Sequence, residues 1–263
     1  MFRTTEISDP KFERNNLRFI TVKTNNLKGR GDICVFVPPI ENAENLPLVV
    51  LLHGVYGSAW VWTHKAGVHI TAWELMQKGI IKPMVIAMPS DGLWGDGSGY
   101  LSHNLQDFEK WIVEDVPNAV IENISGVSNT SEIFISGLSM GGFGALRLGI
   151  KYRDKFKAIS AHSAITDLEQ MPLFVEESMK NYLQEDELEN SVLGIIEKYG
   201  SDIPNLRFDC GSEDKLITCN RELHAILDEK GVKHVYEEFP GAHEWSYWQE
   251  HVKDTLLFFN AIR

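Results

Sequence analysis

The sequence is short of three features that would place it in other classes of protein. It has three cysteines in 263 residues, and their odd number and irregular spacing match neither a disulfide framework nor a zinc site. No apolar run approaches the roughly 18 residues needed to cross a bilayer. Lys and Arg total 25 against 37 Asp and Glu, so the net charge of −12 repels nucleic acid backbones and anionic lipids. We therefore expect a reducing compartment, and neither nucleic acid nor a membrane as a partner.

The N-terminal stretch MFRTTEISDPKFERNNLRF also lacks the apolar centre of a secretory signal peptide. This predicts a cytoplasmic protein. If a leader had been removed from the chain, the same sequence would be compatible with secretion. The oligomeric state is left open by the sequence.

What is present is the composition of an ordinary globular protein, with 43% hydrophobic and 24% charged residues. Short apolar runs alternate with longer helical stretches, a pattern typical of repeated strand–helix–strand units. We expect strands at 47–53, 83–88, 132–136, 156–161, 206–210 and 233–239, after an N-terminal hairpin formed by 16–24 and 32–38. The chain is thus predicted to be one α/β domain over residues 1–263, with a mostly parallel sheet of about eight strands and helices on both faces.

One segment does not fit this alternation. Residues 166–202 carry helical patterning, an acidic centre (QEDELEN) and an apolar cluster near their start (MPLFV). The segment is long for a crossover between two strands. It is either a plain helical excursion or a small cap inserted over a site at the carboxyl edge of the sheet.

The sharpest chemical signal is the stretch EIFISGLSMGGFGALRLGIKY. An apolar strand runs into Gly137-Leu138-Ser139-Met140-Gly141, and a helix follows at once. A serine held on so sharp a turn needs neighbours without a Cβ atom, and the helix N-terminus behind it adds free N–H groups. This is the G-x-S-x-G pattern in the strand–turn–helix context that it requires, and it predicts Ser139 as a nucleophile.

A serine nucleophile needs a base that is oriented by a third group. Among the downstream histidines, His243 alone lies in a loop directly after a predicted strand and before a helix. The loop after the preceding strand offers Glu213 and Asp214, while Asp209 falls within that strand. We predict His243 as the base and Asp214 as the acid, with Glu213 as the alternative.

Two backbone N–H groups should stabilise the oxyanion of the tetrahedral intermediate. One belongs to the residue after the nucleophile, Met140. The other is expected from the glycine-rich loop after the strand PLVVLLH, with Val55 as the first choice. His53 at the end of that strand is expected to be structural.

With these motifs, the chain resembles the esterase D-like branch of the α/β-hydrolases, which includes bacterial carboxylesterases, feruloyl and acetylxylan esterases, S-formylglutathione hydrolases and mycolyltransferases. The resemblance rests on LLHGVYGSAWVW, VIAMPSDGLWGDGSGY, GLSMGGFGA, CGSEDKL and GAHEWSYW, and it runs from about Arg30 to the C-terminus. It implies an α/β-hydrolase fold and the same site: Ser139, His243 and Asp214, with the amides of Val55 and Met140.

We therefore expect a serine carboxylesterase for short- to medium-acyl or aromatic-acid esters, some of them linked to carbohydrate, acting without cofactor or metal. Tyr56, Trp94 and Trp245 are predicted to contact the substrate. The alternatives are an acyltransferase with the same triad, and a binding module that kept the fold without the chemistry.

Overall fold

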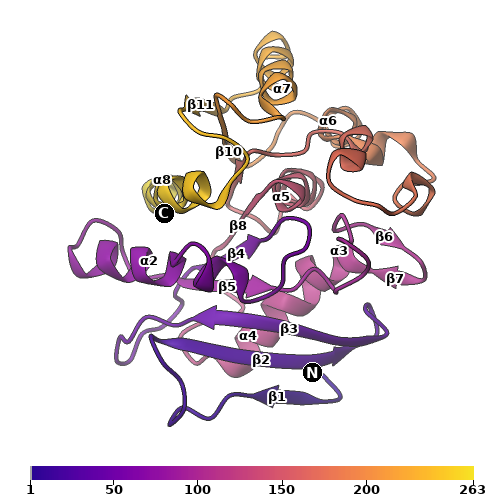
Figure 1. Ribbon diagram of the computed structural model, residues 1–263. Coiled ribbons are helices and arrows are strands. Elements are labelled where there is room, and N and C mark those ends of the chain that lie inside the picture. The colour runs from indigo at the N-terminus through magenta and orange to yellow at the C-terminus, as the bar shows by residue number, and fades with distance from the viewer. Residues whose placement is uncertain (1) are drawn as a thin grey trace.

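The main sheet has nine strands across residues 2–263, which the computed structural model describes (Figure 1). Their spatial order is β1-β2-β3-β5-β4-β8-β9-β10-β11, and the first three are antiparallel to their neighbours while the others are parallel. The strands are β1 (Thr5–Ile7), β2 (Leu17–Thr24), β3 (Gly29–Phe36), β4 (Leu48–Leu52), β5 (Val85–Pro89), β8 (Ile133–Leu138), β9 (Ala158–His162), β10 (Asn205–Gly211) and β11 (Val235–Phe239). The predicted mostly parallel sheet is confirmed, and the ninth strand is the short edge strand β1. A separate hairpin joins β6 (Ser102–His103) to β7 (Gln106–Asp107).

Helices cover both faces of this sheet, and the central strand β4 shows why. Its side chains at 48, 50 and 52 belong to one buried cluster and those at 49 and 51 to another, as the two-residue period of a strand requires. The first cluster packs under α3 (Phe108–Lys110), the π-helix η1 (Trp111–Asp115), α4 (Val116–Asn123), α5 (Met140–Lys151), α6 (Val192–Tyr199) and α7 (Ile217–Glu229). The second packs under α1 (Val61–His64), α2 (Val68–Gln77) and α8 (Trp245–Ile262).

The order of the parallel strands creates a crevice at the middle of the sheet. From β4 the chain moves to β5 on one side, and it later returns to β8 on the other side of β4. The loops that follow β4 and β8 therefore leave the sheet side by side at its carboxyl edge. Ligands of open α/β sheets bind at such a switch point.

The predicted cap segment, residues 166–202, is less helical than its pattern indicates. It forms three short 3₁₀ helices, η2 (Leu168–Leu173), η3 (Met179–Asn181) and η4 (Glu187–Asn190), and then α6. Pro172 lies inside η2 and removes a backbone donor there. Figure 1 shows this segment, which ends with α6, projecting from the sheet on the side of α5.

A buried charge network fastens this segment to α5. The guanidinium of Arg147 on α5 bonds the carboxylates of Glu109 and Glu189, and Lys151 lies 2.9 Å from both carboxylates. Burial acts to raise the pKa of Glu189, but its hydrogen bond with Lys198 and the charge of Arg147 outweigh burial and lower that pKa to about 2. The cap segment is therefore anchored to the helix that follows Ser139.

Candidate active site

Ser139 occupies a sharp turn between β8 and α5. Its φ of 54° and ψ of −120° lie in a region that side chains other than glycine rarely adopt. The amide of Ser139 donates to the carbonyl of His162 at 2.9 Å, and the carbonyl of Ser139 accepts from the amides of Phe143 and Ile165. These bonds hold the residue in a strained conformation with its side chain at the carboxyl edge of the sheet.

The flanking glycines are required by close backbone approach. A Cβ at Gly137 would lie 2.3 Å from the carbonyl oxygen of Gly141. A Cβ at Gly141 would lie 2.5 Å from the carbonyl oxygen of His53. Because both obstacles are backbone atoms, neither position can accept a side chain without moving β4 or the turn.

A chain of hydrogen bonds joins the three predicted triad residues. Nε2 of His243 lies 2.9 Å from Oγ of Ser139, and Nδ1 of His243 lies 2.9 and 3.0 Å from the two carboxylate oxygens of Asp214. Since a carboxylate only accepts, Nδ1 carries the proton and Nε2 presents its lone pair to the serine hydroxyl. His243 follows β11, so three separate loops meet at this point.

Asp214 is held in its ionised form. Burial acts to raise its pKa, but the hydrogen bond and charge interaction with His243 outweigh burial, and the amide of Leu216 and the hydroxyl of Ser163 add to the lowering of that pKa. The alternative acid, Glu213, is exposed, and its side chain makes no bond to His243. The structure thus brings Asp214 to the histidine and leaves Glu213 in solvent.

The two predicted oxyanion donors have free amides. Within residues 2–263, neither Val55 nor Met140 donates its backbone N–H to another protein group. Val55 lines the same pocket as Ser139, and Met140 is the first residue of α5. Two free N–H groups beside one serine are the arrangement that an oxyanion requires.

His53 supports the loop that carries Val55. Its Nδ1 donates to the carbonyl of Gly54 at 2.7 Å, and its Nε2 accepts the amide of Asp91 at 3.1 Å. The amide of Tyr56 donates to the carbonyl of Asp96 at 2.8 Å. His53 is buried and has the structural role expected of it.

A pocket of about 330 Å³ opens above Ser139 and His243. Its wall is mostly apolar and is formed by Gly54, Val55, Gly57, Leu138, Phe174, Glu244, Trp245 and Trp248. Of the three predicted substrate contacts, Trp245 lines this pocket. Tyr56 is 66% exposed and hydrogen-bonds Asp96, and Trp94 packs against His103 and Tyr182, so the structure places both outside the pocket wall.

Phe174 and Trp248 are the two wall residues that contact the imidazole of His243. Phe174 stacks on it with ring centroids 4.8 Å apart, and Trp248 meets it edge-on at 4.9 Å. Trp248 also donates its indole N–H to Ser163 at 3.2 Å. The sequence signal that could have identified Trp248 as a pocket residue is its place in the motif GAHEWSYW. For Phe174 the only signal is the apolar cluster MPLFV, which does not show which of its side chains reaches the site.

A mostly parallel sheet, a serine on a strained turn after β8 and a histidine after its last strand together define the class of α/β-hydrolases. Residues 24–259 match the family described as "Putative esterase". The chain belongs to this esterase family and is a carboxylic ester hydrolase.

Individual proteins are similar to this chain in sequence or in fold. An acetyl esterase of Caldicellulosiruptor saccharolyticus is 28% identical over 84% of this chain and 86% of its own. A solved ferulic acid esterase superposes with a TM-score of 0.79 at 24% identity, covering 98% of this chain and 99% of that one. The S-formylglutathione hydrolase of Staphylococcus aureus superposes with a TM-score of 0.80 at 18% identity, covering 98% of this chain and 100% of that one. None of the helices within residues 2–263 has the length and apolar character needed to cross a membrane.

Proposed function

We propose that the protein hydrolyses carboxylic esters of short to medium acyl chains or of aromatic acids through a serine triad. Ser139 is the nucleophile, His243 the general base and Asp214 the acid that orients it. The observation that carries this proposal is the hydrogen-bonded chain from Ser139 through His243 to Asp214 on the floor of an apolar pocket.

The reaction follows from where the protons lie. Nε2 of His243 takes the proton of Ser139 as its oxygen attacks the ester carbonyl, and the imidazolium that forms is stabilised by Asp214. The amides of Val55 and Met140 stabilise the oxyanion. The imidazolium then protonates the leaving alcohol, and an acyl-enzyme on Ser139 remains. A water molecule, deprotonated by the same nitrogen, releases the acid and restores the serine.

The pocket wall supports the substrate class. Phe174, Trp245 and Trp248 present aromatic surface near the reacting oxygen, and a cavity of about 330 Å³ suits a short acyl chain or one aromatic ring. Acetyl and ferulic acid esterases among the relatives handle acids of these two kinds. An alcohol linked to a carbohydrate would project through the open side of the pocket.

We also propose that residues 166–202 act as a cap over this site within a single domain of residues 1–263. Phe174 belongs to this segment and stacks on His243. Hydrogen bonds fasten the segment to the loop that follows β5. The amide of Asp96 donates to Glu177 and the amide of Glu176 donates to Asp96, each at 2.8 Å, and the hydroxyl of Tyr182 donates to the carbonyl of Gly97 at 2.9 Å. The cap therefore supplies one wall of the pocket.

The test is hydrolysis of p-nitrophenyl esters from acetate to palmitate, together with the ferulate, by the wild type and by Ser139→Ala. We expect turnover of short and aromatic esters, a fall at long chains, and a loss on the order of 10⁴-fold in the variant. An added alcohol or sugar acceptor shows whether acyl transfer competes with hydrolysis. Absence of turnover on every ester, or full activity of Ser139→Ala, would refute the proposal.

A further inference from the structure

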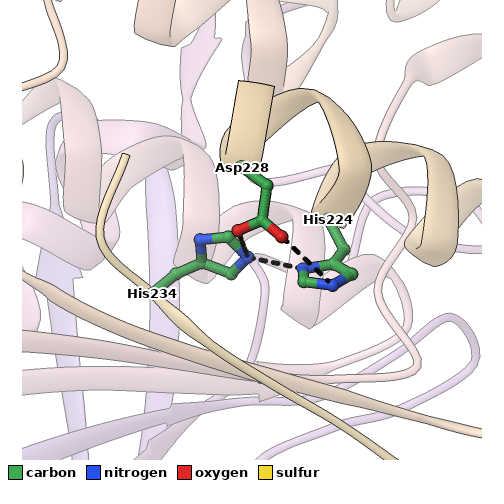
Figure 2. A group of neighbouring side chains, drawn as sticks. All are labelled: His224, Asp228 and His234. Atoms are coloured by element: carbon green, nitrogen blue, oxygen red, sulfur yellow. Dashed lines mark hydrogen bonds and ion pairs between the residues drawn. The ribbon is translucent and has the colours of Figure 1, made fainter. Parts of the chain in front are cut away.

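A second group of titratable side chains, two histidines and one aspartate, lies away from the pocket, on α7 and just before β11. His224 and Asp228 lie one turn apart on α7, and His234 directly precedes β11. Their ligand atoms all lie within 4.8 Å of one another. Figure 2 shows the three side chains pointing toward one another, with Asp228 above the two imidazoles.

Hydrogen bonding fixes how His234 faces this group. Its Nδ1 lies 2.8 Å from the carbonyl of Val232 and therefore carries the proton, so Nε2 presents a lone pair to the cluster. The side chain of His234 is 2% exposed, and this lone pair points at Nδ1 of His224, 2.8 Å away. A backbone carbonyl bonded to the outer nitrogen is the support that metal-binding histidines usually have.

Both imidazoles are also held in place by aromatic rings. His234 stacks on Phe208 of β10 with an interplanar angle of 19°, and His224 stacks on Tyr236 of β11 with an angle of 28°. Rings fixed in this way lose little rotational freedom when a ligand binds. The cluster is thus ordered before any ligand arrives.

The charges of the cluster favour a cation at its centre. Nε2 of His224 lies 3.6 Å from Oδ2 of Asp228, and Nε2 of His234 lies 3.9 Å from Oδ1. Because Nε2 of His234 carries a lone pair, Nδ1 of His224 donates the proton of their contact, and Nε2 of His224 then faces the carboxylate of Asp228 with its own lone pair. A positive charge among the three groups removes this repulsion.

We propose that His224, Asp228 and His234 form a binding site for a divalent transition-metal ion, with Zn²⁺ as the ion that suits it best. Two imidazole nitrogens and one carboxylate are ligands that zinc accepts, whereas calcium and magnesium require oxygen ligands. Water would complete the coordination from the solvent side, where Asp228 is 65% exposed.

The separations fit an ion of this size. Zinc holds such ligands at about 2.0–2.2 Å, so two ligands of one tetrahedral ion stand roughly 3.4 Å apart. Nε2 of His234 lies 2.8 Å from Nδ1 of His224 and 3.9 Å from Oδ1 of Asp228, and one ligand atom of each of the three residues lies within 4.8 Å of the others. Side-chain shifts on the order of one ångström would therefore admit the ion.

The position of the site indicates what the ion would do. It would join the C-terminal turn of α7 to the residue before β11. Asp214 precedes α7 and His243 follows β11, so the joined segment is the one that connects the acid to the base. The ion would lie at the amino end of β11, at the opposite edge of the sheet from His243. It would act as a stabilising clamp and not as part of the hydrolytic site.

The experiment is a zinc titration of protein first stripped with a chelator, with a chromophoric competitor for affinity and with thermal unfolding as a second readout. We expect one zinc per chain and, at about a hundred times Kd, a rise in Tm on the order of 5–10 °C. Ca²⁺ should give no rise. Neither readout depends on esterase activity, so failure of this proposal and failure of the proposed function are distinguishable.

Matched variants locate the ion. His224→Asn and Asp228→Asn change partly exposed side chains of α7, and we expect each to weaken zinc binding at least tenfold and to reduce the Tm shift to about half or less, with the metal-free Tm changed little. Asp254→Asn is the control, because Asp254 pairs with His251 at 2.9 Å as a histidine–aspartate pair outside the proposed site. It should bind zinc like the wild type. Wild-type protein without a zinc-dependent shift, or variants that bind zinc as tightly as the wild type, would overturn the proposal.

Discussion

Residues 2–263 contain two arrangements in which a histidine lies between a hydroxyl and a carboxylate, the reactive chain and the buried chain, and of these two the reactive chain opens onto a pocket. In the first, His243 links Ser139 to Asp214. In the second, Nε2 of His162 lies 2.8 Å from the hydroxyl of Thr255, and its Nδ1 lies 2.8 Å from Asp209. The distances in the two chains are nearly equal. Distance alone therefore does not distinguish a reactive arrangement from a structural one.

Solvent access and backbone geometry separate the two chains. His162, Asp209 and Thr255 are fully buried, so no ester can reach them. Thr255 lies in the middle of a regular helix, α8, whereas Ser139 has a positive φ and a free amide next to it in Met140. Nδ1 of His162 also makes no aligned hydrogen bond to Asp209 despite its closeness. The buried chain lacks the oxyanion donors and the pocket that hydrolysis needs.

The buried chain nevertheless supports the reactive one. The carbonyl of His162 accepts the amide of Ser139 at 2.9 Å, and the carbonyl of Asp209 accepts the amide of Ser163 at 2.8 Å. Asp209 also bonds Arg207 and the hydroxyl of Tyr247. The second chain thus fixes the backbone beneath the nucleophile. The same pattern of residues therefore serves chemistry beside a pocket and order in the core.

The largest expected contrast is between the two hydroxyls. Ser139→Ala should lower kcat by on the order of 10⁴-fold or more, because the nucleophile is removed. Thr255→Val should keep kcat within about threefold and lower the free energy of unfolding by about 1–3 kcal/mol, because a buried partner of His162 is lost. Steady-state kinetics and urea unfolding of both variants measure the contrast. A strong loss of kcat in folded Thr255→Val would break the comparison.

The two carboxylates, Asp214 and Asp209, should show the same contrast as the two hydroxyls. Asp214→Asn should lower kcat by about 10³- to 10⁴-fold with little loss of stability, since the histidine is no longer held in the productive tautomer. Asp209→Asn should keep kcat within about tenfold but cost about 3–5 kcal/mol of stability, because Arg207 stays buried with a weaker partner. If Asp209→Asn proves as stable as the wild type, the buried chain does not have the role given to it here.

A smaller effect should come from the pocket wall, which the buried chain lacks. Phe174→Ala removes the ring that stacks on His243, and we expect kcat/KM for an aromatic ester to fall by about tenfold. For the acetyl ester, which needs less of the wall, the loss should be about threefold or less. Phe258→Ala on α8 is a control for the loss of a partly buried ring outside the pocket. Equal losses on both esters would indicate that Phe174 positions His243 and does not select the acid.

The smallest expected effect is the loss of stability at low pH that protonation of the buried carboxylate of Asp209 causes. Burial acts to raise the pKa of Asp209, but its charge interactions with His162 and Arg207 outweigh burial, and the net pKa is lowered. A lowered carboxyl pKa stabilises the fold fully above the ordinary value near 4, and this contribution is lost as the pH falls through the folded-state value. The difference in unfolding free energy between wild type and Asp209→Asn should therefore stay constant from about pH 7 to 5 and shrink below about pH 4. Urea titrations at pH 7, 5, 4 and 3 test this, and a gap that widens in acid would contradict it.

Much of this architecture could be predicted from local sequence. The apolar runs gave the parallel strands because strands buried on both faces have few other forms. Gly137 and Gly141 marked the turn because their neighbours are backbone atoms. The positions of Asp214 and His243 just after strands placed them at the same edge of the sheet as Ser139.

The rest depends on contacts between distant parts of the chain. The direction of Tyr56 is set by its bond to Asp96, and that of Trp94 by its packing on His103 and Tyr182. Phe174 directly follows η2 and stacks on His243, from which it is separated by about 70 residues of sequence. No local pattern encodes these directions.

The two histidine clusters outside the pocket could not be predicted from the local sequence either. His162 meets Asp209 and Thr255 across three elements, and His224 meets His234 through the turn between α7 and β11. His162, Asp209 and Thr255 have no characteristic spacing, and only the order of the sheet brings them together. His224 and Asp228 have the four-residue spacing of one helix face, but only the turn before β11 brings His234 to them.

The most direct test of the account is labelling with an organophosphorus fluoride, followed by peptide mass spectrometry. This reagent phosphorylates a serine only where a neighbouring base raises its nucleophilicity. We predict one adduct per chain, on Ser139, with loss of esterase activity in proportion to labelling and with no adduct in Ser139→Ala or on Thr255. An adduct on another residue that accounts for the lost activity, or full activity after Ser139 is labelled, would contradict the assignment of Ser139, His243 and Asp214 as the catalytic triad.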